Sequence, residues 1–231
     1  MAREPHIVGL GGHGDTPEQT LALMRHIASL TGKARPRVLH VPTAVGDSPE
    51  YTVAFYERWG RLGEPSHLRF FPYPPSDLRE LALAQDAISV GGGNTANMLA
   101  IWRLHGFDRI LREAWESGVV LFGGSAGMIC WFEAGVTDSF GPQLEGMEDG
   151  LGFLAGSACP HYDGEALRRP RYRELVAGGF PEGLAADDGV GLHFVGTELR
   201  EVVTCRQGAA AYRVTRGGEQ LLEANDLVTR L

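Results

Sequence analysis

The stretch Gly118-Val-Val-Leu-Phe-Gly-Gly-Ser-Ala-Gly-Met-Ile-Cys-Trp-Phe132 decides how this chain can fold. Its apolar run at 119–122 predicts a buried strand, which breaks at residues 123–127 and resumes as an apolar segment that can pack as a helix. A strand, a glycine-rich turn and a helix with one hydroxyl at the apex form the pattern G-x-S-x-G. In that pattern Ser125 stands above the sheet edge, and the Ala126 amide points toward an oxyanion formed when the serine attacks a carbonyl. The alternative interpretation is an ordinary glycine-rich loop between a strand and a helix.

The composition is that of a globular protein that can bury a core. Of its 231 residues, 43% are hydrophobic and 22% are charged, which is ordinary for such proteins. This length suits one α/β domain, so we expect a single domain over residues 1–231. The net charge of -8, without a long basic run, argues against nucleic acid or an anionic membrane surface as the main partner.

The chain shows no targeting or membrane signal that we recognise. Residues 1–6 lack a signal-peptide pattern and no long apolar run occurs, so we expect a cytoplasmic protein. Its three cysteines are odd in number and far apart, which argues against a disulfide framework and against a structural zinc site.

Apolar segments that predict strands alternate with segments that predict helices over the first 135 residues. The expected strands cover residues 7–10, 37–43, 68–72, 86–90 and 119–122, and the expected helices 17–31, 49–62, 77–84, a segment after Thr95 and 107–117. This alternation predicts a doubly wound, mostly parallel sheet flanked by helices. Farther on we expect a short helix at 171–177 and a β-rich C-terminal part with antiparallel strands at 189–195, 199–205 and 209–214.

Two further glycine-rich segments follow predicted strands. Residues 11–14 do not match a nucleotide-binding motif, so a tight turn is favoured there over an anion site. Residues 91–93 let the backbone approach a ligand closely, and Asn94 or Thr95 can cap the next helix. Residues 91–93 and Ser125 both follow carboxyl ends of strands, where ligands bind in doubly wound folds.

A serine nucleophile needs a base and a group that orients the base. Spacing alone leaves three candidates for the base, namely His13, His161 and His193. Four carboxylates are candidates for the orienting group, namely Asp138, Asp163, Asp187 and Asp188.

Several segments taken together resemble the S51 serine peptidases, a family that includes aspartyl dipeptidase (peptidase E) and cyanophycinase. These segments are Val90–Thr95, Gly124–Gly127 with the extension Ile129–Glu133, Thr137–Ser139 and Pro160-His161. The resemblance runs over most of the chain and implies a fold related to class I glutamine amidotransferases, with serine in place of their elbow cysteine. Cys130 lies too far beyond Ser125 to take that place. The resemblance implies no metal and no organic cofactor.

The resemblance also implies roles for individual residues. Ser125 matches the nucleophile, His161 matches the base, and the amides of Gly93 and Ala126 would form the oxyanion hole. The third catalytic position holds a glutamate before a glycine in the family, and the matching residue here is Asp188. Because Asp is one methylene shorter, either the backbone shifts or another carboxylate serves. Asp138 matches a second acidic position that the family places near the site, and we rank it after Asp188.

Specificity is less clearly indicated. Peptidase E reads an N-terminal aspartate with an arginine beyond the histidine, and a guanidinium suits a carboxylate. The comparable region here contains Arg168, Arg169, Arg171 and Arg173. From these we take Arg168 and Arg171, together with Asn94, as candidate substrate-binding residues.

We therefore expect a serine exopeptidase that acts on short peptides, either a broad aminopeptidase or an aspartyl dipeptidase. Two alternatives remain. One is a cyanophycinase-like hydrolase of other amide or isopeptide substrates, and the other is a catalytically silent amidotransferase-like binding module. The sequence leaves the oligomeric state open, including a homo-oligomer.

Overall fold

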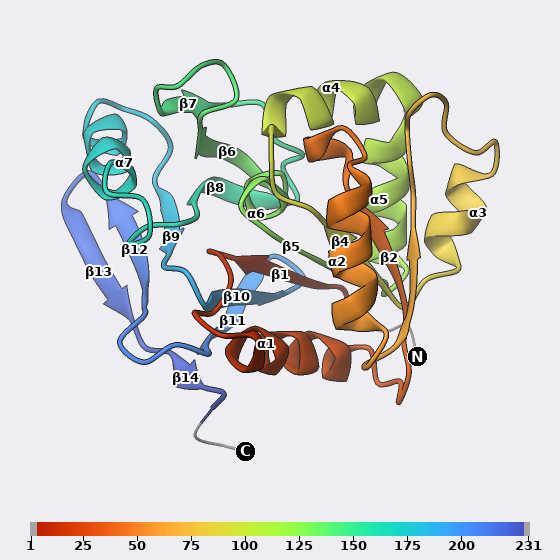
Figure 1. The fold of residues 1–231 in the computed structure, drawn as a ribbon. Helices are drawn as coiled ribbons and strands as arrows, with labels where there is room; N and C mark the ends of the chain where they lie inside the picture. Colours follow the sequence, from red (N-terminus) through yellow and green to blue (C-terminus); the bar gives the residue numbers. More distant parts are fainter. Residues whose placement is uncertain (1–3, 229–231) are drawn as a thin grey trace.

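The central sheet of the computed structural model, which describes residues 4–228, has eight strands in the order β14-β11-β10-β1-β5-β4-β2-β3 (Figure 1). Its strands are β1 (His6–Leu10), β2 (Arg37–Val41), β3 (Glu64–His67), β4 (Ala87–Val90), β5 (Val120–Gly124), β10 (Val190–Val195), β11 (Glu198–Thr204) and β14 (Asn225–Asp226). The neighbouring pairs β1–β5, β5–β4, β4–β2 and β2–β3 are parallel, whereas β10 is antiparallel to both β1 and β11. The predicted mostly parallel sheet is therefore present.

A second, six-stranded sheet has the order β13-β12-β9-β8-β6-β7. Its strands are β6 (Phe132–Thr137), β7 (Glu145–Met147), β8 (Leu154–Cys159), β9 (Gly183–Ala186), β12 (Ala211–Thr215) and β13 (Gly218–Leu222). In Figure 1 this sheet lies to the left of the central one, next to α7 (Arg168–Ala177). The segment between Ser125 and β10 thus supplies β6, β7, β8 and β9 of this second sheet.

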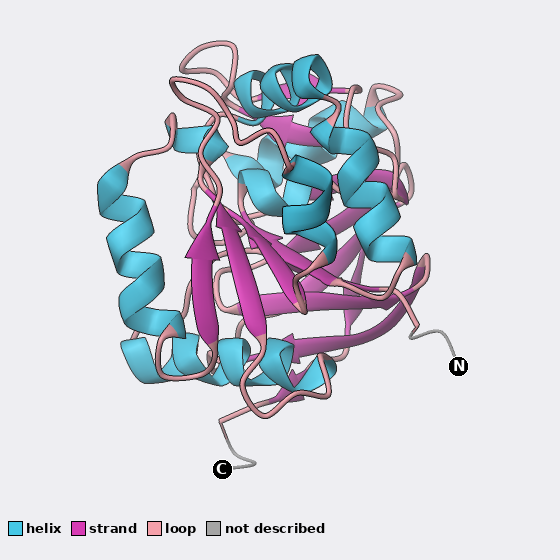
Figure 2. Ribbon diagram, turned by 90° about the vertical axis from the view of Figure 1, so that its right-hand side faces the viewer, coloured by secondary structure: helices cyan, strands magenta, loops and turns pink. Residues whose placement is uncertain are grey.

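Helices cover both faces of the central sheet, as Figure 2 shows. The remaining helices are α1 (Pro17–Leu30), α2 (Pro49–Trp59), α3 (Leu78–Leu83), α4 (Thr95–His105), α5 (Phe107–Glu116), α6 (Ala126–Ile129) and a 3-10 turn at Thr43–Val45. Successive side chains of a strand point to opposite faces, so Val8 packs with α1 and α2 while Ile7 packs with α4 and α5. This alternation makes the sheet doubly wound.

The predicted starts of two helices are confirmed by their caps. Thr16 accepts a hydrogen bond from the amide of Gln19, whose side chain accepts one from the Thr16 amide, so α1 begins with a capping box. Asn94 caps α4 by accepting from the Asn97 amide. These caps fix where the chain turns from the sheet edge into each helix.

One predicted element is wrong, because the third strand lies at Glu64–His67 instead of 68–72. The helix expected after Ser125 is present as α6 but has only 4 residues. The strands β6, β7, β8 and β9 lie where the sequence predicted no strand. Within residues 4–228, no helix combines the length and the apolar character that a membrane span requires.

Candidate active site

Ser125 occupies a strained turn between β5 and α6. Its backbone has φ 57° and ψ -119°, a conformation that a non-glycine residue adopts only when its surroundings enforce it. The flanking glycines explain how the turn fits, because a Cβ on Gly123 or Gly127 would lie 2.5 or 2.3 Å from the Val90 carbonyl oxygen. The strand, turn and short helix therefore present the Ser125 hydroxyl at the carboxyl end of β5.

The second glycine-rich loop lies directly against this serine. A Cβ on Gly92 would be 3.2 Å from the Ser125 Cβ, and Gly93 has φ 131°. Within residues 4–228, the amides of Gly93 and Ala126 have no hydrogen-bond acceptor in the protein. Two backbone N–H groups beside Ser125 are thus free to donate to a substrate oxygen.

His161 and Asp188 form a hydrogen-bonded pair. The distance from His161 Nδ1 to Asp188 Oδ1 is 2.6 Å. The backbone of His161 has φ 53°, and its amide donates to the Gly11 carbonyl at 3.1 Å. The first glycine loop therefore holds the backbone of His161, which is a structural use that the sequence interpretation as a simple turn did not include.

Asp188 is itself held by two residues. Its amide donates to Asp163 Oδ1 at 2.9 Å, and its carbonyl accepts from Arg206 Nε at 2.9 Å. Arg206 also forms an ion pair with Asp163. Burial is the largest single influence and acts to raise the pKa of Asp163, but the hydrogen bonds from Arg206 and from the Asp188 amide, with the charge of Arg206, together outweigh it and the pKa is lowered. Asp163 is therefore an ionised support for Asp188. Nothing in the sequence around Arg206 marks it for this role.

Ser125 and His161 line one cavity of about 580 Å³, together with His13 and residues 91–93. Its apolar lining comes from α1, α2 and β5, with Leu23, Met24, Ile27, Phe55, Trp59 and Phe122 among the residues. Apart from histidines, its charged lining residues are Glu50 and Arg58 on α2. The sequence analysis predicted a helix here but did not single out these two residues.

The structure does not bring the remaining predicted residues into this cavity. Asp138 is exposed and is not among the residues that line it. Arg168 is buried and donates to the Val136 carbonyl and to Glu165, while Arg171 donates to the Leu144 carbonyl and to Glu174.

Asn94 serves the glycine loop. Its side chain caps α4 and donates to the Ser139 carbonyl, and the Ser139 hydroxyl accepts from the amides of Thr95 and Ala96. The Thr137–Ser139 segment, which carried part of the family resemblance, therefore anchors the loop that faces Ser125.

The other candidate bases and carboxylates have different surroundings. His193 contacts His6 and Glu201 and does not line the cavity. Asp187 is buried, and its Oδ2 accepts from the Ala210 amide. Burial raises the pKa of this carboxyl to about 6. His40 lines the cavity, and burial, followed by the nearby His67, lowers its pKa to about 4. His40 is therefore neutral near pH 7.

Comparison with known proteins places the chain in a family. The sequence profile of peptidase family S51 matches residues 7–202. An uncharacterized peptidase of Bacillus subtilis (strain 168), YgaJ, is 48% identical over 220 residues, which cover 94% of this chain and 95% of that protein.

Two solved structures share the fold. A peptidase from an acI-B1 Actinobacterium superposes with a TM-score of 0.68 at 21% identity, covering 96% of this chain and 95% of that one. A putative peptidase E from Listeria monocytogenes EGD-e gives a TM-score of 0.64 at 18% identity, covering 87% and 98%. The predicted fold is confirmed, and with the profile match and the Bacillus relative these findings show that the chain belongs to peptidase family S51.

Proposed function

We propose that this chain is a serine exopeptidase that hydrolyses short peptides with Ser125, His161 and Asp188 as its catalytic triad. The observation that carries the proposal is that Ser125 and His161 line one cavity while His161 Nδ1 lies 2.6 Å from Asp188 Oδ1. With Nδ1 engaged by the carboxylate, the imidazole keeps Nε2 to accept the serine proton.

The proposed reaction proceeds through an acyl-enzyme. Ser125 Oγ attacks the peptide carbonyl as its proton passes to His161, and the oxyanion accepts from the amides of Gly93 and Ala126. His161 then gives the proton to the leaving amine. Water, deprotonated by the same imidazole, attacks the ester and releases the second product. Each step uses only groups of this chain, the peptide and water.

The size and lining of the cavity favour short substrates with an apolar residue. Its volume of about 580 Å³ falls within the range of about 300–1,000 Å³ typical of small-molecule sites. Arg168 and Arg171 are engaged elsewhere and do not line the cavity, whose lining is mainly apolar. We therefore favour an aminopeptidase or dipeptidase that prefers Leu-, Met- or Phe-type residues over a strict aspartyl dipeptidase.

Arg58 and Glu50 give the cavity two opposite charges. Both side chains are exposed, and both residues line the cavity from α2. A dipeptide carries a carboxylate that suits a guanidinium and an ammonium group that suits a carboxylate. We propose that Arg58 binds the substrate carboxylate, so Arg58→Ala should raise KM for dipeptides at least about tenfold with little change in kcat. An unchanged KM would remove Arg58 from the substrate site.

The decisive experiment compares the wild type with Ser125→Ala on a dipeptide panel. The panel contains Leu-X, Asp-X and β-Asp-Arg substrates, and Leu-X is expected to be cleaved fastest. The variant should lose at least about 10³-fold in kcat while its far-UV circular dichroism stays that of the wild type. Hydrolysis by the variant at the wild-type rate would refute the proposal.

The same experiment separates the alternatives. Selective cleavage of β-Asp-Arg would indicate a cyanophycinase-like hydrolase, and selective cleavage of Asp-X an aspartyl dipeptidase. Labelling with a fluorophosphonate tests for a silent binding module, because such a protein would not become labelled at Ser125.

A further inference from the structure

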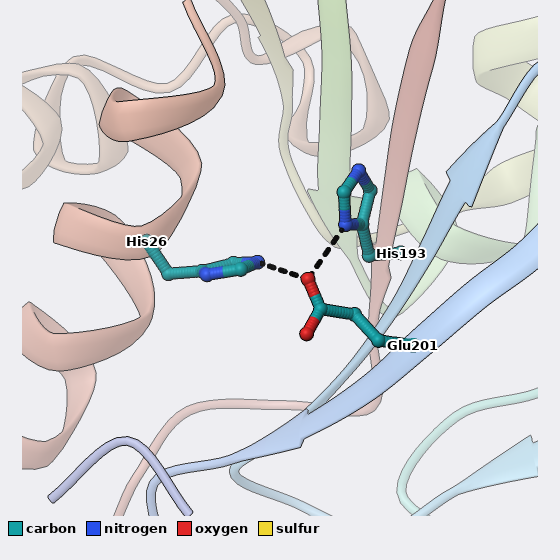
Figure 3. Close-up of side chains that lie close together, drawn as sticks. All are labelled: His26, His193 and Glu201. Atoms are coloured by element: carbon teal, nitrogen blue, oxygen red, sulfur yellow. Dashed lines mark hydrogen bonds and ion pairs between the residues drawn. The ribbon is translucent and has the colours of Figure 1, made fainter. Parts of the chain in front are cut away.

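Three side chains that can bind a metal meet on the central sheet, outside the cavity that contains Ser125. Figure 3 shows His26 on α1 pointing toward Glu201 on β11, with His193 on β10 directed at the same carboxylate. His193 and Glu201 are register partners across two antiparallel strands, so the sheet itself fixes their spacing. None of the three residues lines the cavity that contains Ser125.

The distances suit one small ion. Glu201 Oε1 is 3.1 Å from His193 Nδ1 and 3.7 Å from His26 Nε2, and the three ligand atoms all lie within 4.8 Å of one another. An ion with bonds of about 2.0–2.1 Å in tetrahedral geometry separates its ligand atoms by roughly 3.4 Å. The two measured separations lie on either side of that value. The third pair, His26 Nε2 and His193 Nδ1, lies within 4.8 Å, so small side-chain rotations can bring the three atoms to one ion.

The surroundings hold two of these side chains in place. His193 Nε2 lies 2.9 Å from His6 Nδ1, so the nitrogen that does not face Glu201 is engaged by a second imidazole. Asn225 Nδ2 donates to Glu201 Oε2 at 3.2 Å. Ligand residues of metal sites are oriented by such outer hydrogen bonds, which fix the imidazole tautomer and the carboxylate plane.

His26 supplies an independent observation. Its Nε2 atom is buried and, within residues 4–228, has no hydrogen-bond partner, although Glu201 lies at ion-pair distance. A buried polar atom without a partner destabilises the fold. A metal ion placed between His26, His193 and Glu201 would give this nitrogen the partner that the protein does not provide.

We infer that the chain binds one divalent transition-metal ion of the zinc class through His26 Nε2, His193 Nδ1 and Glu201 Oε1. Two imidazoles and one carboxylate are a ligand set that Zn²⁺ accepts, with a fourth position left for water. Mg²⁺ and Ca²⁺ prefer sites made of oxygen ligands and are expected to bind far more weakly. The ion joins α1 to β10 and β11, and α1 also contributes Leu23, Met24 and Ile27 to the cavity. Its role is therefore to stabilise the helix that forms one wall of the substrate site.

The test measures metal binding directly. Full-length protein without an affinity tag is stripped with a chelator, dialysed against Zn²⁺ or Mg²⁺, and analysed for bound metal by mass spectrometry. We expect about one Zn²⁺ per chain, no retained Mg²⁺, and a rise in Tm with increasing Zn²⁺ concentration. Co²⁺ in place of Zn²⁺ should give the visible absorption of a tetrahedral nitrogen and oxygen site.

Variants identify the site. His26→Gln and Glu201→Gln should each weaken Zn²⁺ binding at least about 100-fold and abolish the Zn²⁺-dependent rise in Tm. His105→Gln, at an exposed position on α4, is the matched control and should bind like the wild type. Absence of bound Zn²⁺ in the wild type, or undiminished binding in both folded variants, would overturn the inference. Because the readout is metal content and Tm, it does not depend on the peptidase reaction.

Discussion

At the scale of single residues, Asp188 reaches His161 because glycines leave room for a short carboxylate. A Cβ on Gly12 would lie 1.8 Å from Asp188 Oδ1, and a Cβ on Gly164 would lie 2.1 Å from Oδ2. The family resemblance implied a glutamate at this position, which left open how the shorter side chain of Asp188 could serve. Gly12 and Gly164 lie directly against the two carboxylate oxygens, so the space beside His161 fits the shorter side chain of aspartate.

Asp188→Asn is predicted to lower kcat by about 10³–10⁴-fold, because an amide can donate to Nδ1 and favours the wrong imidazole tautomer. KM should change little, since Asp188 does not line the cavity. Asp188→Glu should also lose activity because the longer side chain has no space beside Gly12 and Gly164. Steady-state kinetics on a cleaved dipeptide measure both variants. Wild-type kcat in Asp188→Asn would exclude this carboxylate from the triad.

The members of the proposed triad differ in how far the sequence could predict them. Ser125 lies in a local motif whose spacing reflects close contacts of Gly123 and Gly127 with β4, so the motif alone indicates the turn. His161 comes from a loop far along the chain, and only the family resemblance singled it out from His13 and His193. Arg206 acts on Asp188 through tertiary contacts, which leave no mark in the sequence.

His40 gives the protein a pH-dependent stability. In the folded chain burial lowers its pKa to about 4, against 6.5 for an ordinary histidine. Between these values the unfolded chain binds the proton more readily, so the free energy of unfolding falls as the pH decreases through 6.5 toward 4. From pH 7 to pH 5 the loss due to this residue is about 2 kcal/mol.

His40→Phe should remove that loss. Phenylalanine can keep the stacking on Phe55, whose ring centroid lies 4.4 Å away, and it eliminates two buried ring nitrogens without partners among the described residues. Urea unfolding at pH 7 and pH 5 measures the effect as the difference between variant and wild type, because every other titrating group is present in both. An equal loss of stability on acidification in the two proteins would contradict the assignment.

At the scale of elements, the first glycine loop supports the hydrogen-bonded pair of His161 and Asp188. Gly11 accepts from the His161 amide, and the Gly12 position lies against both His161 Nδ1 and Asp188 Oδ1. Gly12→Ala should therefore displace the pair and lower kcat/KM by about 100-fold. Gly141→Ala is the control, since its Cβ would meet only the Gln143 side chain at 3.7 Å. Equal activity of the two variants would show that the loop does not position the pair.

The strands that the sequence pattern did not predict carry few large apolar side chains. The strand β3 lies at the sheet edge and pairs only with β2 through its backbone, while Leu68 and Phe70 enter the core from a loop. The apolar pattern thus pointed to 68–72 instead of Glu64–His67. The strands β8 and β9 contain mainly small residues, whose strand propensity is weak. These segments are strands because they form backbone hydrogen bonds with neighbouring strands on both sides.

At the scale of the whole molecule, one hydrophobic core joins the two sheets. Leu121 of β5 belongs to the same buried cluster as Ala158 of β8 and Leu184 of β9. Side chains from both sheets therefore lose their packing together when either sheet separates. The single domain over residues 1–231 stays a prediction, and from it we expect the two sheets to unfold in one cooperative transition.

Buried groups in the two sheets test that prediction. Cys159 lies in the cluster between the second sheet and α7, whereas Trp59 belongs to a cluster on the central sheet and Trp102, Trp115 and Trp131 belong to the core that joins the two sheets. Pulsed alkylation across a urea titration, read at Cys159 by peptide mass spectrometry, should give the same midpoint as tryptophan fluorescence. Cys130, buried in the core that joins the two sheets, is the internal reference, and its alkylation should show the same midpoint. If Cys159 reacts at a lower urea concentration than the fluorescence transition, the second sheet unfolds separately and the chain is two domains.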